Sequence, residues 1–363
     1  MNNPIISMVH GSGGQATGQL IHDIFSKEFQ NDILNQMEDA AIVSGSEQIA
    51  MTTDSFVVTP LEYPGGDIGR LCVCGTVNDL LMRGAIPKYM TCGFILEEGL
   101  QIEQLKGIVH SMAETAREAG VQIVAGDTKV IEGNGGLYIN TTGVGIVLQG
   151  YAISASGAQA GDAILVSGDM GDHHAAILSQ RMSIENRIES DNAPLGAMVD
   201  ALRQGGVKIH AMRDITRGGL ATVLKELAEA SKTCFMIEEA QIPVSAQVKD
   251  FCGLLGLDPL YMGNEGKMAV IVPAEEAELA VKIMRETIYG QHAARIGQVL
   301  GSDSDFSNAF DGRRERSRDS VEEYGNIRQD PPIKKAGSLI LRTPIGGLRS
   351  LSILQGEGLP RIC

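Results

Sequence analysis

The sequence predicts an α/β protein, of the α+β type, with two packed domains of mixed strands and helices and a flexible C-terminal arm. Two halves of the chain each alternate strand patterns with helical patterns. The 363 residues are enough for two domains that each bury a core. The alternation does not fix the topology of either domain.

Changes in composition set the expected boundaries. The polar stretch 302–335 has few apolar residues, so it cannot bury enough surface to offset the entropy of ordering, and we expect a flexible insertion there. The other segments are a glycine-rich loop and helix at 1–41, an N-terminal α/β domain at 42–150, a C-terminal α/β domain at 151–301, and a short hairpin with a cysteine-bearing arm at 336–363.

In the first half, the helix at 102–119 has the clearest pattern. Leu105, Ile108 and Met112 belong to an apolar stripe at helical spacing, and Gly120 is suited to cap the C-terminal end. The other elements expected in this half are a helix at 68–85 and strands at 49–59, 88–96, 121–125 and 137–148.

In the second half, residues 267–272 are mostly apolar and predict a buried strand. Residues 337–354 alternate around Gly346-Gly347, which predicts a hairpin. The remaining elements expected here are a strand at 163–167 and helices at 173–181, 194–204, 219–230 and 275–288.

Composition excludes several classes of function. The net charge of −15 disfavours nucleic acid as a partner, because no basic field replaces the counterions of the phosphates. No apolar run approaches the length of a membrane helix and no secretion signal is evident, so we expect a cytoplasmic protein without a membrane partner. Six cysteines without a Cys-x-x-Cys pair fit a reducing compartment and argue against a structural zinc site.

The thiol of Cys363 is tethered on one side only, so it can enter a site, be loaded with a small group and leave again. Pro360 stiffens the approach, and Arg361 could anchor the arm to an anionic surface or a bound phosphate. The alternative is a chance cysteine at a frayed terminus. We expect no prenylation, since it requires a cysteine four residues from the end.

Acidic residues lie beside glycines or at strand ends. Asp54, Asp127 and Asp214 have this placement, whereas Asn78 and Asp79 lie late in an otherwise apolar helix, where short polar side chains are unusual. Each acid alone could be a turn former, a helix cap or a solvated side chain. Together, oxygen ligands from several strand ends could hold Mg²⁺ between the oxygens of a triphosphate.

The segment His10-Gly-Ser-Gly-Gly14 precedes a helix expected at 16–25. The backbone amides of Gly11, Gly13 and Gly14 could close over phosphates. The segment is neither a Walker A loop nor a G-x-G-x-x-G motif, so a flexible loop is the alternative.

Lys129 and Glu265 are further candidates. Lys129 follows Asp127 by two positions, so both side chains would project to one face of an extended segment. Glu265 is flanked by glycines just before a buried strand, where a carboxylate could act as a general base. An exposed turn acid is the alternative for Glu265.

Several motifs are spread along the chain: His10-Gly-Ser-Gly-Gly, Gly75-Thr-Val-Asn-Asp79, Gly126-Asp-Thr-Lys-Val, Asp214-Ile-Thr-Arg-Gly-Gly, Asn264-Glu-Gly-Lys and the final Leu-Pro-Arg-Ile-Cys363. Together they resemble the HypE family of nickel–iron hydrogenase maturation proteins, within the aminoimidazole-ribotide-synthetase-like ATP-binding superfamily. The resemblance covers nearly the whole chain except 302–335, and the terminal motif is its most specific part.

The resemblance implies a two-domain aminoimidazole-ribotide-synthetase-like fold, with ATP binding and homodimer formation in the first domain. In that family the carbamoyltransferase HypF loads the terminal cysteine with a carbamoyl group. ATP-dependent dehydration then gives a thiocyanate, and the cyano group passes to iron on a HypC–HypD scaffold. By this resemblance, Cys363 is the carrier thiol. Asp54, Asn78, Asp79, Asp127 and Asp214 match positions around Mg²⁺ and ATP, with Asp54, Asp79, Asp127 and Asp214 as metal ligands, and Lys129 and Glu265 match residues near the loaded arm.

The sequence leaves open which residue is the base, which subunit the arm serves, and whether the chain has another function. Glu265 would accept a proton as the nitrile forms, but Lys129 could be the base if its pKa were depressed. The arm could act in its own subunit or across a dimer. A selenophosphate synthetase or a thiamine-monophosphate kinase would share the carboxylates without requiring Cys363, although no cysteine precedes Cys72 as the former commonly requires. A non-catalytic thiol carrier would show no ATP turnover.

Overall fold

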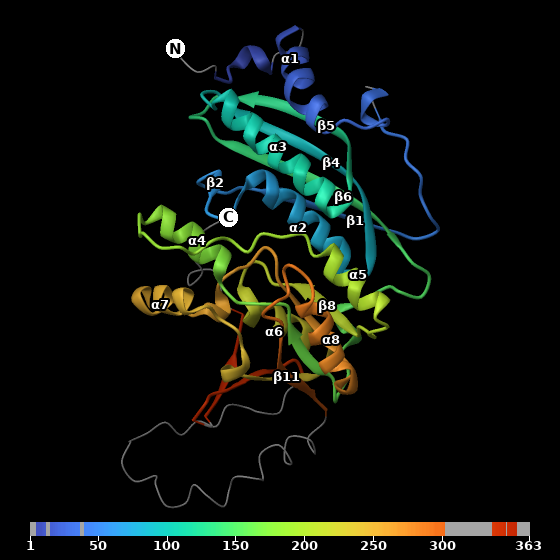
Figure 1. Ribbon diagram of the computed structural model, residues 1–363, viewed down its shortest axis with the longest axis vertical. Helices are drawn as coiled ribbons and strands as arrows, with labels where there is room; N and C mark the ends of the chain where they lie inside the picture. Colours follow the sequence, from blue (N-terminus) through green and yellow to red (C-terminus); the bar gives the residue numbers. More distant parts are fainter. Residues whose placement is uncertain (1–4, 12–14, 37–39, 302–335, 346, 354–363) are drawn as a thin grey trace, which may run out of the picture.

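The computed structural model describes residues 5–11, 15–36, 40–301, 336–345 and 347–353 (Figure 1). Within these ranges the chain forms a four-stranded sheet, a seven-stranded sheet and a small two-stranded ribbon. The predicted insertion and the predicted arm lie outside the described residues. In the described ranges no helix is both long enough and apolar enough to cross a membrane.

The four-stranded sheet has the order β1-β6-β4-β5. Its β4–β5 pair is parallel, and its other pairs are antiparallel. Helices α2 and α3 cover one face of the sheet, whereas no helix within the described ranges covers the opposite face (Figure 1). The elements are β1 (Ile49–Phe56), β4 (Ala85–Glu97), β5 (Gln122–Ile131), β6 (Leu137–Val147), α2 (Ile68–Met82) and α3 (Ile102–Ala119).

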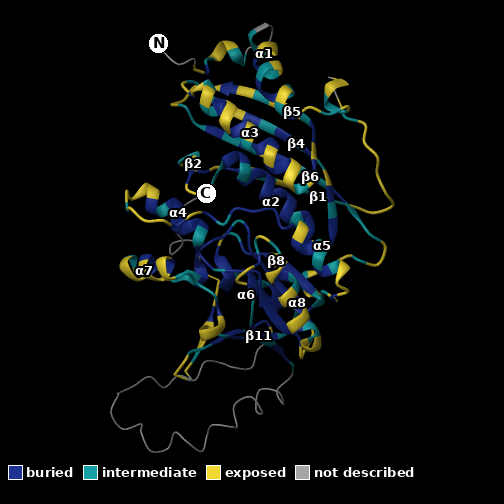
Figure 2. Cartoon of the chain, viewed as in Figure 1, coloured by how far each residue is buried: buried dark blue, intermediate teal, exposed yellow. Residues whose placement is uncertain are grey.

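Helices α2 and α3 differ because their surroundings differ. α3 has an apolar stripe on one side, and it ends at Gly120, which adopts the left-handed conformation with φ 70°. α2 is buried along almost its whole length, because it packs on the first sheet and also contacts α5 (Gly196–Gln204) and β8 (Ala211–Asp214) (Figure 2). Both belong to the second unit, which is built around the seven-stranded sheet. The helix predicted at 68–85 therefore stops earlier, at Met82, because Ala85 already begins β4.

The N-terminal helix α1 (Gln15–Leu20) continues into a π-helical segment, η2 (Ile21–Ser26). These elements match the helix predicted at 16–25, with a wider last turn than expected. Phe25 of η2 lies 4.6 Å from Phe94 of β4, measured between ring centroids, so the segment packs beside the first sheet.

The seven-stranded sheet has the order β13-β12-β9-β11-β7-β10-β8, and only β12 and β9 pair in parallel. Its last two strands form the predicted hairpin, which is confirmed. The elements are β7 (Ala163–Val166), β8 (Ala211–Asp214), β9 (Cys234–Glu238), β10 (Met268–Val272), β11 (Ala294–Leu300), β12 (Leu339–Arg342), β13 (Leu348–Leu351), α4 (Asp172–Arg181), α5 (Gly196–Gln204), α6 (Gly219–Ser231), α7 (Ala246–Leu255) and α8 (Ala277–Arg285).

The two sheets share one hydrophobic core. Val77 and Leu81 of α2 belong to the same buried cluster as Val199 of α5 and Val270 of β10. Because this cluster is continuous, α2 is fixed against both sheets. The side chains near the C-terminal end of α2 are therefore held where the two sheets meet.

Gly69 in α2 allows a close approach between α2 and α3. A Cβ at Gly69 would lie 2.3 Å from the carbonyl oxygen of Ile108, so we expect Gly69→Ala to lower the free energy of unfolding by about 1–3 kcal/mol. Gly107 in α3 is the matched control, because a Cβ there meets nothing within 4 Å. Gly107→Ala should raise the stability by about 0.5–1 kcal/mol through helix propensity. Urea unfolding measures both, and equal effects of the two substitutions would contradict the packing argument.

Candidate active site

A polar pocket lies where the first sheet meets the second unit. Its cavity has a volume of about 160 Å³, and four of its lining side chains are carboxylates from separate segments. Asp54 comes from β1, Asp79 from α2, and Asp214 from the end of β8, and Glu265 lies in the loop before β10. The other lining residues are Ser55, Phe56, Val57, Leu71, Gly75, Thr216 and Arg217.

Hydrogen bonds position Asp54, Asp79 and the loop that carries Glu265. Thr52, two residues before Asp54 on β1, donates its hydroxyl hydrogen bond to Asp79 Oδ2 at 2.8 Å, which ties β1 to α2. Asp54 Oδ1 accepts a hydrogen bond from its neighbour, the backbone amide of Ser55, at 2.8 Å. The backbone amide of Glu265 donates to Asp191 Oδ1 at 3.0 Å, which fixes the loop that carries Glu265.

Burial and like charge shift the pKa values of these acids. Burial raises the pKa of Asp214 to about 7, and the neighbouring Asp79 adds to the shift. Burial also raises the pKa of Asp79, with a further contribution from Asp54. The pKa of Glu265 is held well above its ordinary value by burial and then by Asp191, although Arg217 opposes the shift. A cation in this pocket would relieve the repulsion.

The carboxylates fit Mg²⁺ as hard oxygen donors, but not as a complete cage. Among the described residues, no three His, Cys, Asp or Glu side chains are grouped closely enough to hold a metal ion by themselves. Mg²⁺ usually keeps several waters and is held by one or two carboxylates together with substrate phosphates. The donor set therefore suits Mg²⁺ that arrives with a triphosphate.

Asn78 lies next to Asp79 but does not line the pocket. Its Nδ2 donates to the backbone oxygen of Ala193 at 3.0 Å, and its Oδ1 accepts from the backbone amide of Leu195 at 2.9 Å. A longer contact of 3.4 Å reaches the backbone oxygen of Glu265. The amide thus joins α2 to the second unit rather than facing a ligand.

Asp127 and Lys129 form a separate group. Both oxygens of Asp127 accept from Lys129 Nζ at 2.6 Å, and the two side chains are exposed, which confirms that they share a face. The strand predicted at 121–125 was too short, because β5 continues to Ile131 by pairing with β4, so Asp127 lies within the strand rather than after it.

The sheet order separates this pair from the pocket. Asp127 aligns through Gly93 and Asn140 with Ser55, the neighbour of Asp54, so Asp127 and Asp54 lie on opposite faces at opposite edges of the sheet. The strand spacing places the two edges roughly 14 Å apart. Within one chain, Asp127 does not join the other predicted metal ligands.

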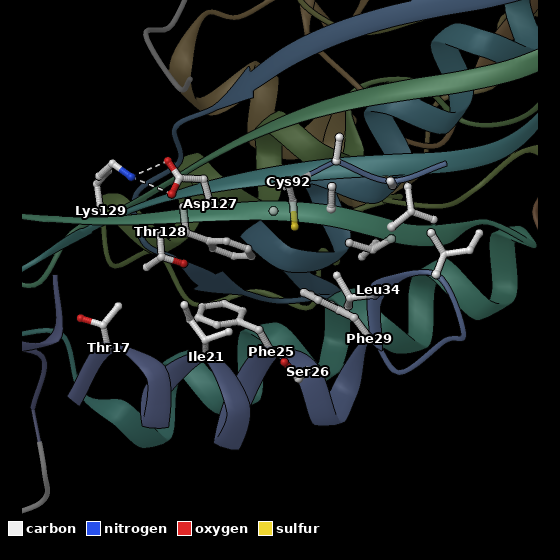
Figure 3. Close-up of a pocket in the computed structure, with 18 of the residues that line it drawn as sticks. Thr17, Ile21, Phe25, Ser26, Phe29, Leu34, Cys92, Asp127, Thr128 and Lys129 are labelled. Carbon is white, nitrogen blue, oxygen red and sulfur yellow. Dashed lines mark hydrogen bonds and ion pairs between the residues drawn. The ribbon is translucent and has the colours of Figure 1, made fainter. Parts of the chain in front are cut away.

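Asp127 and Lys129 instead border a cavity of about 390 Å³ between β5 and the N-terminal helices (Figure 3). Phe25 and Phe29 point into this cavity from below (Figure 3). Gly11 also lines it, and a Cβ at Gly11 would lie 2.6 Å from the Cβ of Val130, so only a glycine fits there. Gly13, Gly14 and Cys363 lie outside the described residues.

The chain matches two models of AIR synthase related proteins, the N-terminal domain over residues 37–147 and the C-terminal domain over residues 159–308. It is 45% identical to a protein named carbamoyl dehydratase HypE from Cupriavidus necator, over 99% of this chain and 95% of the relative. The chain belongs to the HypE family. The predicted two-domain aminoimidazole-ribotide-synthetase-like fold is thereby confirmed, and membership argues against a selenophosphate synthetase or a thiamine-monophosphate kinase.

Solved HypE structures cover the same span. A hydrogenase maturation protein HypE in complex with ATP has 45% identity and a TM-score of 0.87, and the match covers 98% of this chain and 99% of that one. HypE in a HypE–HypF complex has 40% identity and a TM-score of 0.72, with coverage of 92% and 99%. The architecture described here is therefore that of the HypE family.

Sequence reasoning missed the side chains of Thr216 and Arg217, which line the pocket beside Asp214. Both lie inside the motif Asp214-Ile-Thr-Arg, so the signal was present. Arg217 is the basic residue that lines this pocket and partly offsets the acids.

Because the pKa of Asp214 is raised, we expect Asp214→Asn to increase the stability of the metal-free protein by an amount that depends on pH. The folded pKa of about 7 exceeds the ordinary 3.9, so the ionised carboxylate costs stability that appears as the pH rises from about 4 to about 7 and is constant above that. The substitution should therefore raise the melting temperature at pH 8 and have little effect near pH 4. A gain of equal size at both pH values would contradict the ionisation argument.

Proposed function

We propose that this HypE-family chain is an ATP-dependent carbamoyl dehydratase, a carbon–oxygen lyase that converts an S-carbamoyl group on its own Cys363 into a thiocyanate. The convergence of Asp54, Asp79, Asp214 and Glu265 in one pocket supports the proposal most directly. The names of the relatives agree with it, and one of them was solved with ATP. The thiocyanate would supply cyanide ligands for hydrogenase iron.

The carboxamide oxygen is a poor leaving group. Bound ATP with Mg²⁺ would supply a phosphoryl group for that oxygen, so that phosphate departs in place of hydroxide. Asp54, Asp79 and Asp214 would hold Mg²⁺ against the triphosphate, and Arg217 would neutralise charge beside them. Gly11 lies beside Asp127 and not in this pocket, so its backbone, with that of the glycines that follow it, would close over phosphates only in the site of a second subunit.

Loss of phosphate must be matched by loss of protons from the carbamoyl nitrogen. Glu265 suits the role of general base, because its carboxylate lines the same pocket as the acids that would hold the nucleotide. Lys129 is paired with Asp127 and suits the role of a cation that neutralises charge on a phosphoryl oxygen. We therefore assign the base to Glu265.

The uncovered face of the first sheet fits a homodimer. Ile49, Met51, Ile95 and Ile131 are exposed there, at 49%, 64%, 43% and 42%. A second copy paired on this face would bury them and would bring its own β5 toward the pocket. We propose that the partner subunit's Asp127 and the partner's Lys129 complete the site in this way.

Further partners follow from the family. One relative was solved in a HypE–HypF complex, and HypF would load Cys363 with the carbamoyl group. A HypC–HypD scaffold would accept the cyano group. These steps would take place in the cytoplasm.

Mass spectrometry tests the activity directly. After carbamoylation by HypF, addition of Mg²⁺ and ATP should cause the C-terminal peptide that contains Cys363 to lose the mass of one water. Cys363→Ala should show neither carbamoylation nor water loss, whereas omission of ATP should leave the carbamoyl group in place. A carbamoyl group that persists with ATP would instead indicate a passive carrier, and a thiol that is never modified would refute both ideas.

Subunit exchange tests the shared site. Glu265→Gln and Lys129→Ala homodimers should each be inactive, because each lacks one member of every site. Mixing them should restore about a quarter of the wild-type rate, since half of the dimers are mixed and each mixed dimer has one intact site. Differently tagged subunits confirm the exchange. If confirmed exchange restores no activity, Lys129 does not act across the dimer, and an active Glu265→Gln homodimer would remove Glu265 as the base.

A further inference from the structure

A second polar pocket lies on the other side of the loop that carries Glu265. Its cavity has a volume of about 400 Å³, and its lining includes Asp169, Asp172, Glu189 and Asp191. Asp191 connects the two pockets, because its Oδ1 accepts from the backbone amide of Glu265 while its side chain lines this second cavity. We call this cavity the rear pocket.

Two buried acceptors in the rear pocket lack a donor. The side chain of Asp191 is 2% exposed, and its Oδ2 has no hydrogen-bond partner within the described part of the chain. Lys267 Nζ lies 3.5 Å away, which gives an ion pair without a hydrogen bond. Asn192 is 3% exposed, and its Oδ1 is likewise without a donor among the described residues. A buried acceptor without a donor destabilises the folded chain, so a donor ligand is expected.

The basic side chains of the pocket do not fill this need. Arg70 also lines it, but its guanidinium donates to Glu118 at 3.0 Å, to the backbone oxygen of Asn192 at 2.8 Å and to Tyr289 at 3.1 Å. His292 is paired with Asp169. The acids Asp172 and Glu189 remain at the pocket, so the ligand should be a cation with several N–H donors.

Such a group lies two residues before Cys363 in the sequence. Arg361 is the one basic residue in 354–363, and a guanidinium has five N–H donors in a fixed planar arrangement. We propose that Arg361 docks its guanidinium against Asp191 and Asn192 in the rear pocket and thereby carries Cys363 to Glu265. This inference rests on the proposed role of Cys363 as the carrier.

The length of chain permits this docking. The oxygen of Ser352, near the end of the described chain, accepts a hydrogen bond from the Tyr261 hydroxyl at 3.0 Å. Tyr261 precedes Glu265 by four residues, at most about 14 Å of extended chain, whereas the segment from Ser352 to Arg361 extends to about 30 Å. Cys363, two residues beyond Arg361, can reach about 7 Å further.

Alkylation of the full-length chain tests the docking without ATP or HypF. Iodoacetamide should modify Cys363 slowly in the wild type, and Arg361→Ala should raise the rate about tenfold, as expected for loss of a charged hydrogen bond. The other five cysteines are buried and serve as internal controls in the same spectra. Equal rates in the wild type and Arg361→Ala would overturn the proposal.

A double-mutant cycle identifies the pocket. Asp191→Asn should raise the alkylation rate as Arg361→Ala does, and the double substitution should add nothing further, because both remove one interaction. Glu278→Gln, an exposed acid on α8, is the matched control and should leave the rate unchanged. Independent, additive effects of the two substitutions would place Arg361 elsewhere and overturn the proposal.

Folding of the variants and dehydration by the chain are measured alongside alkylation. Melting curves report whether Asp191→Asn is folded, and Asp172→Asn repeats the cycle at the rim of the pocket if it is not. Because alkylation involves no ATP and no carbamoyl group, a protected Cys363 in a chain that never loses water would refute the proposed activity alone. Normal dehydration by a chain with an unprotected Cys363 would refute the docking alone.

Discussion

The site depends on the hydrogen bonds of Asn78, which fix α2 against the second unit. Because the Asn78 amide bonds to the backbone at Ala193 and Leu195, the next residue, Asp79, is held where Asp214 approaches from β8. α2 is buried on all sides and has no solvated face, so it cannot rotate about its own axis. The short polar pair in an apolar helix thus divides two tasks between neighbours, one structural and one facing the pocket.

The pocket carries an electrostatic cost that the rest of the fold offsets. Burial of Asp214, with added repulsion from Asp79 and Asp54, raises its pKa to about 7. The continuous core shared by α2, α5 and β10 supplies the opposing stability. The acids of the pocket repel one another while no cation is bound, and this repulsion lowers the stability of the fold. A bound cation would relieve the repulsion, so the same repulsion strengthens metal binding.

Sequence patterns predicted the elements with a strong period. The apolar stripe of α3 and its capping glycine predicted its bounds correctly, whereas β8 and β9 were missed because strands of four and five residues leave little periodic signal. The longer strand β11 and the helix α7 were also missed. The acids were found by residue type. Their separation into two groups in space was not predicted, because it depends on the order of the strands in the sheet. Asp127 and Asp54 both lie on strands of one sheet, yet the order β1-β6-β4-β5 places them at opposite edges and on opposite faces.

The separation of Asp127 and Lys129 from the acidic pocket affects how the proposed activity would be controlled. If the partner's Lys129 completes each site, assembly and catalysis are linked, because the surface that buries the exposed apolar side chains of the first sheet also delivers the missing cation. The proposed docking in the rear pocket would add a second condition, since Glu265 would act on Cys363 only while Arg361 is bound there. An isolated subunit, or a dimer whose arm is engaged by HypF, would then leave bound ATP without an acceptor. Separating the acids into two groups would therefore limit wasteful hydrolysis of ATP in the absence of a loaded thiol.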